Sequence, residues 1–334
     1  MKKLFIALTI ILVGLFAVAC NEAKEEKTPI KVAAALTGSK TDGGWNQSAY
    51  EGLLKMEKDL KAEVSYNENT QAADYERILR DYAKAGNDLV IGHGAQFSDA
   101  AKKVAEEFPD IFFIVTSTNV TNNKNLGSLN NNYWEAGFLK GAFAALMSKT
   151  GTVGAVGGAN ISPIQNDIKG FEIGAKYVNA NIKVLSAFTG SGDDSNKAKE
   201  TALSFIAQGA DVIEANANQA GKGVYAATQE KGVYSLASIS DVEYKNYTDT
   251  LIAAATADMA TALFNAAKQV QDGTYVAQYK LNSVADEIID FTYNPALKSK
   301  VPADVTKKMD DIKAKMKTFE IDAQKLVTGN ATTK

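Results

Sequence analysis

The residues best placed to do chemistry lie in the stretch 37–53, which reads TGSKTDGGWNQSAYEGL. This stretch follows a short apolar strand, predicted for Val32–Leu36, and leads into an amphipathic helix, predicted for Asn46–Lys61. At such a turn of a parallel sheet, backbone N–H groups, one carboxylate, one indole and one amide would face a crevice. We therefore expect this stretch to form one wall of a small-molecule pocket.

Few other residues could carry catalysis or hold a metal. His93 is the single histidine and Cys20 the single cysteine, whereas histidine-based zinc sites combine two or three ligands. The motifs G-x-S-x-G and G-x-x-x-x-G-K-[ST] are absent, and the glycines at 151, 154, 157 and 158 lack the G-x-G-x-x-G spacing. We expect no enzyme, no cofactor and no metal site, and we interpret His93 as a polar residue at a strand end. A net charge of −3 gives no general attraction to nucleic acid.

The first residues have the pattern of an export signal. Two lysines precede the apolar run Leu4–Ala19, which at about 16 residues is short for a membrane-spanning helix and is followed at once by the charged segment Asn21–Thr28. Cys20 falls at the junction, where the alternatives are a free thiol, a signal cut after Ala19, or a lipid-modified first residue. The position favours the lipid. We predict a signal peptide over 1–19 and a lipidated tether over 20–29, so that palmitate-type chains alone would hold the protein on the extracytoplasmic face of the cell membrane, at the cell surface or in a periplasm.

From Ile30 onward, short β-rich runs alternate with helical runs of about 10 to 17 residues, a pattern that predicts right-handed βαβ units and a parallel sheet. The pattern restarts after Leu126–Leu129, which gives two comparable α/β halves. A strand at Leu251–Ala255, a helix at Asp258–Asp272, a run at Tyr275–Tyr279 and a helix at Ala303–Leu326 follow. The extra segments let the chain cross between halves more than once, as a hinged binding protein needs.

Ligands of open α/β sheets bind outside the carboxyl ends of the strands. The loops expected there are rich in Gly, Asn, Ser and Thr and poor in charge, which suits a neutral polar ligand better than phosphate or metal, although turns in general share this composition. These loops are Thr37–Asn46, His93–Ser98, Thr116–Asn119, Gly157–Asn166, Thr189–Ser195, Asn216–Gly221 and Ser240–Tyr244.

Seven segments, in order, resemble the basic membrane protein family of lipoproteins, which are substrate-binding proteins of ATP-driven importers related to purine nucleoside receptors. They are DGGWNQSAYEGL (42–53), LVIGHGAQFSDAAKKVAEEFPDIFF (89–113), EAGFLKGAFAA (135–145), TGTVGAVGG (150–158), GFEIGAKYVN (170–179), QGADVI (208–213) and EKGVYS (230–235). The resemblance implies the two-lobed type I binding-protein fold, an α/β fold in which each lobe is a parallel sheet flanked by helices and the lobes close around a ligand by a hinge motion. The implied lobes are 30–128 plus 254–273 and 129–253 plus 274–328.

The resemblance also implies site residues. The family's first-loop acid and amide fall on Asp42 and Asn46, and its aromatic residues fall on Trp45 and Phe97, where stacking on a planar ring would fit a purine. Ordinary loop packing is the alternative for both aromatic residues. The expected ligand-binding set is Asp42, Gly44, Trp45, Asn46, Gln96, Phe97, Asn131, Asn166, Asn216, Asn218 and Asp241.

The second half departs from the family pattern. Where nucleoside receptors read roughly G-V-D-S-D, with the first acid on the ribose hydroxyls, this chain has Ile239 in place of that acid and keeps only the second one, Asp241. A family lysine is replaced by Ala255, and the glycine-rich loop by Asn216–Gln219, with Glu214 just before it. Losing a buried acid weakens the binding of a sugar hydroxyl, so the expected ligand is purine-like, a nucleobase or a nucleoside held differently.

These observations predict a monomeric, lipid-anchored solute-binding protein that delivers a purine-like ligand to an ABC permease. Three alternatives remain open: a receptor for another ring compound such as a flavin, a ligand sensor that signals to a membrane receptor, and an exported nucleoside-processing enzyme.

Overall fold

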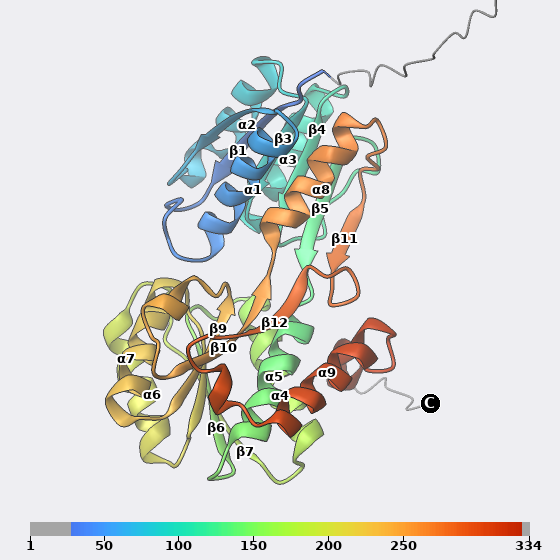
Figure 1. Cartoon of the computed structure of the whole chain (residues 1–334). Helices are drawn as coiled ribbons and strands as arrows, with labels where there is room; N and C mark the ends of the chain where they lie inside the picture. Colours follow the sequence, from blue (N-terminus) through green and yellow to red (C-terminus); the bar gives the residue numbers. More distant parts are fainter. Residues whose placement is uncertain (1–27, 329–334) are drawn as a thin grey trace, which may run out of the picture.

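The computed structural model describes residues 28–328 as two six-stranded sheets, each flanked by helices and joined by several connecting segments (Figure 1). The predicted α/β class with two parallel-dominated sheets is confirmed. Within the described range, no helix has the length and apolar character needed to cross a lipid bilayer. The expected signal peptide and Cys20 lie outside the described residues.

The first sheet has the order β11-β5-β4-β3-β1-β2, with every neighbouring pair parallel. Its strands are β1 (Lys31–Leu36), β2 (Glu63–Asn67), β3 (Leu89–His93), β4 (Phe112–Thr116), β5 (Leu126–Asn131) and β11 (Tyr279–Asn282). Its helices are α1 (Trp45–Asp59), α2 (Tyr75–Lys84), α3 (Ser98–Glu107) and α8 (Met259–Gln271). The inner strand β1 is apolar and buried at five of its six positions because helices cover both faces of the sheet.

The second sheet has the order β12-β10-β9-β8-β6-β7, in which only the β10–β12 pair is antiparallel. Its strands are β6 (Thr152–Gly157), β7 (Lys183–Phe188), β8 (Val212–Asn216), β9 (Tyr234–Ile239), β10 (Leu251–Ala257) and β12 (Ile289–Tyr293). Its helices are α4 (Tyr133–Met147), α5 (Ser162–Val178), α6 (Ser195–Ala207), α7 (Gly221–Lys231), α9 (Ala303–Lys317) and α10 (Ala323–Thr328).

Helices α4 and α5 of this second half cross at very short range, and glycines make the contact possible. A Cβ atom added at Gly137 would lie 1.9 Å from the carbonyl oxygen of Asp167, and one at Gly141 would lie 1.9 Å from that of Phe171. The reciprocal positions on α5, Gly170 and Gly174, are equally crowded, at 2.3 and 2.1 Å from carbonyl oxygens of α4. Both helices therefore carry a G-x-x-x-G spacing that brings the two backbones together.

The chain passes between the two sheets at three places: from β5 to α4, from β10 to α8, and from β11 to β12 (Figure 1). Strand β11 pairs with β5 of the first sheet, although the expected division assigned residues 274–328 to the second lobe. Strand β10 lies in the second sheet through Ala257, so residues 254–257, which the expected division assigned to the first lobe, belong to the second. Short edge strands with a mixed polar sequence, such as YKLN in β11, carry no periodic signal that would reveal their partner.

The C-terminal segment also differs from its prediction. One helix was expected over Ala303–Leu326, but α9 ends at Lys317 and α10 begins at Ala323. Phe319 adopts a φ of 57° between them, a left-handed conformation that a continuous helix cannot contain.

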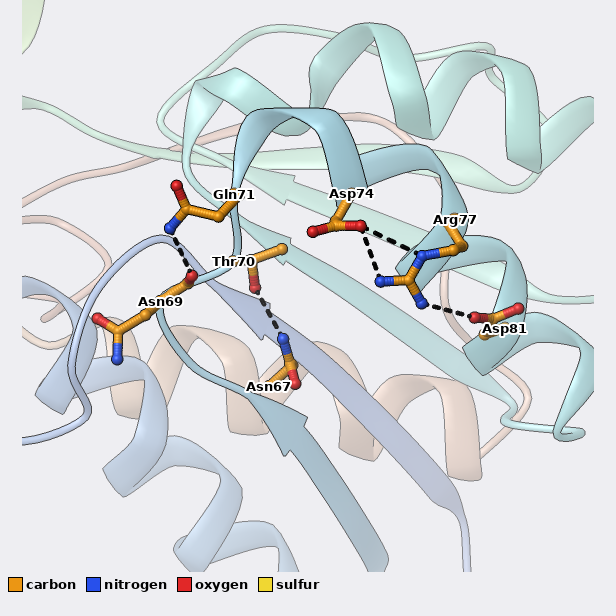
Figure 2. Close-up of polar contacts among 7 residues, drawn as sticks. All are labelled: Asn67, Asn69, Thr70, Gln71, Asp74, Arg77 and Asp81. Atoms are coloured by element: carbon orange, nitrogen blue, oxygen red, sulfur yellow. Dashed lines mark hydrogen bonds and ion pairs between the residues drawn. The ribbon is translucent and has the colours of Figure 1, made fainter.

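The loop between β2 and α2 supports the first wall of the predicted pocket. The backbone N–H groups of Asn69 and Thr70 donate to the carbonyl oxygens of Gly38 and Leu36, at 3.2 and 3.0 Å. Figure 2 shows the side-chain bonds that hold this loop and the start of α2, which join Asn67 to Thr70, Gln71 to Asn69, and Arg77 to Asp74 and Asp81. The loop that carries Thr37–Gly44 therefore rests on a hydrogen-bonded neighbour.

Candidate functional site

A cavity of about 600 Å³ lies between loops at the carboxyl ends of strands from both sheets. Pockets for small organic ligands commonly have this size. The first half contributes residues of its β1 and β3 loops, among them Thr37, Asp42, Gly44, Trp45 and Gln96. The second half contributes residues from the loops after β6, β8 and β9, among them Ile161, Ile164, Asn216, Asn218, Ser238 and Ile239. The cavity therefore lies where ligands of open α/β sheets are expected, outside the carboxyl ends of the strands.

Asp42 holds the first wall of the cavity together by hydrogen bonds to its own loop and to the start of α1. Its Oδ1 accepts from the N–H groups of Gly44 (2.9 Å) and Gln47 (3.1 Å), and its Oδ2 accepts from the backbone N–H and side-chain Nδ2 of Asn46, at 3.0 and 2.8 Å. Four hydrogen bonds at the start of α1 use both carboxylate oxygens, and a negative charge at a helix N-terminus is itself favourable. Asp42 lines the cavity but is already engaged.

Asn46 does not line the cavity, contrary to its place in the expected ligand set. Its side chain is buried behind the wall, where Oδ1 accepts from the Gly38 N–H at 3.1 Å and from the Thr37 hydroxyl at 3.3 Å. The hydrogen bonds of Asp42 and Asn46 together fix the conformation of the loop Thr37–Gly44. Asn46 therefore supports the wall without contacting the cavity.

Trp45 is the aromatic residue of this wall, and His93 fixes its ring. The indole and imidazole rings stack with centroids 4.0 Å apart and an interplanar angle of 21°. His93 Nε2 lies 3.0 Å from the Trp45 carbonyl oxygen, and Nδ1 lies 3.0 Å from Thr116 Oγ1. Because a carbonyl only accepts, Nε2 carries the proton and Nδ1 accepts from the Thr116 hydroxyl. Burial lowers the pKa of His93 to about 4, so the imidazole is neutral at pH 7. His93 ends β3, as predicted.

Phe97, expected as a ligand-binding residue with loop packing as the alternative, lies outside the cavity lining. Its side chain is fully buried in the first half, where its ring packs against Tyr75 with centroids 4.2 Å apart. It also fills the space beside Gly92, whose Cβ would lie 2.6 Å from Phe97 Cβ. The neighbouring Gln96 does line the cavity. The short 3₁₀ turn Ala95–Phe97 points successive side chains in different directions, which a loop composition does not reveal.

Three more expected residues lie away from the cavity. Asn131 is buried at the end of β5, where its Oδ1 accepts from Asn282 Nδ2 of β11 at 3.2 Å. Asn166 lies on α5, half-buried and outside the lining. Asp241 is exposed, with its nearest polar partner, Thr292 Oγ1, at 3.5 Å. Of the expected set, the structure brings Asp42, Gly44, Trp45, Gln96, Asn216 and Asn218 together around the cavity.

The sequence did not reveal the apolar part of the lining. Ile161, Pro163 and Ile164 at the start of α5 line the cavity, together with Ile239 at the end of β9. Ile239 has a φ of 74°, which is unusual for a β-branched residue and marks a constrained site. The second wall therefore presents an apolar surface to the cavity at these four positions.

A buried ion cluster behind the second wall was also missed. Lys140 Nζ lies 2.7 Å from Asp167 Oδ2 and 2.6 Å from Glu214 Oε2, and it forms a hydrogen bond with Ser238 Oγ. The side chains of Lys140, Asp167 and Glu214 are at most 1% exposed. Burial, and then the neighbouring Asp167 carboxylate, raise the pKa of Glu214. A charged residue inside an apolar segment, as in FLKGAF and DVIEAN, was the signal available in the sequence.

One hydrogen bond joins the two halves at the cavity-lining residue Asp42, and one ion pair lies in the lining itself. Gln219 Nε2, just before α7, donates to the carbonyl oxygen of Asp42 in the first half. Lys222 and Glu243, which both line the cavity, form an ion pair at 3.5 Å within the second half. Among the described residues, no group of three or more His, Cys, Asp or Glu side chains could hold a metal ion. The site is therefore equipped for binding through stacking, apolar contact and neutral hydrogen bonds.

Two α/β halves with a cavity between the carboxyl ends of their strands define a solute-binding protein of the type I fold. The chain belongs to the family of PnrA-like ABC transporter substrate-binding proteins (Bmp), whose family description matches residues 30–326. The predicted resemblance to basic membrane proteins is confirmed.

Individual relatives agree with this assignment. The chain is 27% identical over 301 residues to a purine-binding protein of Brucella abortus, covering 89% of this chain and 83% of the relative. It is 31% identical over 238 residues to an ABC transporter nucleoside-binding protein of Lactococcus lactis, covering 67% and 68%. A solute-binding protein of an ABC transporter system from Aeropyrum pernix has a similar fold, with a TM-score of 0.78, 19% identity and coverage of 90% and 98%.

Proposed function

We propose that this substrate-binding protein captures an uncharged, purine-like ligand, a nucleobase or a nucleoside, in the cavity between its halves and delivers it to an ABC importer. The observation that carries the proposal is the Trp45 ring, which lines the cavity and is held flat by a neutral histidine. One face of the indole is covered by His93, so the remaining surface is available to a planar heterocycle.

The rest of the lining supports the same chemistry. Asn216, Asn218 and Gln96 offer amide donors and acceptors that match the edge of a purine, and the isoleucines offer an apolar contact for its faces. Asp42 already accepts four hydrogen bonds, and Lys222 is paired with Glu243. Little uncompensated charge is left to attract a phosphate or a carboxylate, which favours a neutral ligand. The purine and nucleoside binding named for two relatives agrees with this choice.

Hinge closure is the proposed mode of capture. The halves are joined by three connecting segments, and the Gln219–Asp42 hydrogen bond links them at a residue that lines the cavity. A ligand that touches both walls would stabilise the closed arrangement, because only that arrangement makes both sets of contacts. The closed, loaded form is then the one that the permease would distinguish from the open form.

The lipid anchor is proposed on the sequence alone. We propose that Cys20 becomes the lipid-modified first residue of the mature chain and tethers it to the extracytoplasmic face of the membrane. Mass spectrometry of the membrane-extracted protein should show a diacylglyceryl mass on a peptide that begins at Cys20, and Cys20→Ser should release the chain into the soluble fraction. An unmodified Cys20 peptide from membranes would contradict this part.

Two tryptophans allow the ligand proposal to be tested sharply, because Trp134 lies outside the lining. In Trp134→Phe, Trp45 is the single tryptophan, and with excitation beyond the tyrosine band, titration with adenine, guanine, inosine or guanosine should change its emission. In the matched control Trp45→Phe, the same ligands should leave the emission of Trp134 unchanged. Calorimetry should show that they bind this variant more weakly than the wild type. A ligand at a hundredfold excess over its Kd should also stabilise the wild-type fold by about 2.7 kcal/mol.

The outcomes separate the ligand classes. Native mass spectrometry of protein purified without refolding should show a bound mass equal to a base or nucleoside. Stabilisation by riboflavin and by none of the purines would favour the flavin alternative. Absence of any shift with purines, nucleosides and flavin would refute the proposal.

A further inference from the structure

The buried cluster of Lys140, Asp167, Glu214 and Ser238 reaches the cavity at one atom. Lys140 lies on α4, Asp167 on α5, Glu214 on β8 and Ser238 on β9, so the cluster joins four elements of the second half. The three charged side chains are hidden from the cavity, whereas Ser238 is half-buried and lines it. The Ser238 hydroxyl is thus the end of the cluster that a ligand can touch.

The donors and acceptors of the cluster determine whether the Ser238 hydroxyl donates or accepts toward the cavity. A lysine ammonium has three N–H donors and no acceptor. Lys140 Nζ donates to Asp167 Oδ2 at 2.7 Å and to Ser238 Oγ, and it forms an ion pair with Glu214 Oε2 at 2.6 Å. In the contact with Lys140, the serine oxygen must therefore accept, and the serine proton must point elsewhere.

The charge on Lys140 is maintained by its surroundings. Burial disfavours the ammonium, but the carboxylates of Asp167 and Glu214 outweigh this effect and raise the pKa of Lys140. A hydroxyl that accepts from a cation becomes a better donor, because the two hydrogen bonds polarise each other. Across residues 28–328, the Ser238 hydroxyl makes no hydrogen bond to a protein acceptor.

We infer that Ser238 is a specificity-determining residue, which presents a proton to the cavity and selects ligands that place an acceptor, a ring nitrogen or a carbonyl oxygen, against it. This inference rests on the proposed function, because it takes the cavity as the ligand site. Lys140 acts as a positioning residue through Ser238, and Asp167 and Glu214 hold Lys140 in place. A ligand with an N–H or C–H group at the same position leaves the serine proton unsatisfied.

The test compares adenine with its 1-, 3- and 7-deaza analogues and guanine with its 3- and 7-deaza analogues, in which one acceptor nitrogen of the ring becomes C–H. Guanine is also compared with 6-thioguanine, in which sulfur, a weaker acceptor, replaces the carbonyl oxygen. In the wild type, one analogue should bind about tenfold more weakly than its parent base, because one acceptor is lost at a buried donor. In Ser238→Ala that difference should disappear, and in Ser238→Thr, which keeps the hydroxyl, it should return. Thermal melting of each variant checks that the fold is intact.

Ser162→Ala is the matched control, because it removes another serine hydroxyl from the cavity lining without changing the cluster. It should keep the tenfold difference between the base and the same analogue. The inference is overturned if no analogue differs from its parent base in the wild type, or if Ser238→Ala retains the difference.

Failure of the proposed function would give a distinct result, since no purine would then bind the wild type at all. In that case a neutron structure of the ligand-free protein decides the inference. A deuterium on Ser238 Oγ that points into the cavity supports it, and one directed at a protein acceptor overturns it.

Discussion

Replacing Gly141 by alanine should loosen the crossing of α4 and α5 and, through it, the second wall of the cavity. The new Cβ would lie 1.9 Å from the Phe171 carbonyl oxygen, whereas real Cβ atoms essentially never come within 3.0 Å of a neighbour. The obstacle is backbone on a packed helix, so no side-chain rotation can relieve it. The two helices would have to separate by about 1.1 Å at this point.

Two opposing terms set the size of the effect. Overpacking a dense core costs about 3 kcal/mol when backbones must shift, and alanine gains about 1 kcal/mol over glycine in helix propensity. The net expectation is a loss of about 2 kcal/mol in the free energy of unfolding. The same separation would stretch the Lys140–Asp167 contact from 2.7 Å beyond hydrogen-bond range, so ligand affinity should fall as well.

Urea unfolding followed by circular dichroism, with calorimetric titration of the ligand, measures both effects. Gly221→Ala is the matched control, since its Cβ would meet Ala215 Cβ at an ordinary 3.6 Å. That variant should be as stable as the wild type or slightly more so. If Gly141→Ala unfolds within about 0.5 kcal/mol of the wild type, the helices can separate at little cost and the reasoning is refuted.

Two further predictions concern the Glu135–Val284 hydrogen bond, next to the crossing from β5 to α4, and the Gln219–Asp42 hydrogen bond between the halves. Glu135 Oε2 accepts from the Val284 N–H at 2.7 Å, and burial raises its pKa from 4.5 to about 7. The folded state therefore binds more protons between these values, so the wild type should lose about 3 kcal/mol as pH rises through this window. Glu135→Gln should match the wild type at pH 4 and exceed it at pH 8 in urea unfolding; equal stability at both pH values would contradict this. Gln219→Ala removes the contact to Asp42 and should speed ligand release several-fold in stopped-flow fluorescence without changing stability. The exposed control Gln208→Ala should leave the release rate unchanged. An unchanged release rate in Gln219→Ala would show that the contact does not hold the cavity closed.

The regular part of the fold was accessible from the sequence, because alternating strands and helices of a buried parallel sheet leave strong periodic signals. Strand β11 and the break in the last helix were not. Phe319 is exposed and interrupts the helix by its left-handed backbone conformation, which an apolar residue type does not predict. Strand β11 pairs with the distant β5, and a local sequence pattern does not identify such a partner.

The site was predicted unevenly for a related reason. Trp45 begins α1 after the β1 loop and Asn216 ends β8, and the topology brings both positions to the cavity. Phe97 lies in the loop after β3, but its ring turns into the core, since side-chain direction depends on the turn geometry. Lys140 and Glu214 are 74 residues apart in the chain, and only the folded second half reveals that they pair.

The late position of β11 has a consequence for how the protein is made. Asn131 and Asn282, which are hydrogen-bonded across β5 and β11, are 151 residues apart, and α8, which covers α1, is also synthesised after the second sheet up to β10. The first half cannot be completed until most of the chain has left the ribosome, because its edge strand and one covering helix are synthesised late. Pairings of such long range form slowly. A delay of this kind suits the proposed export, in which the chain crosses the membrane before it folds.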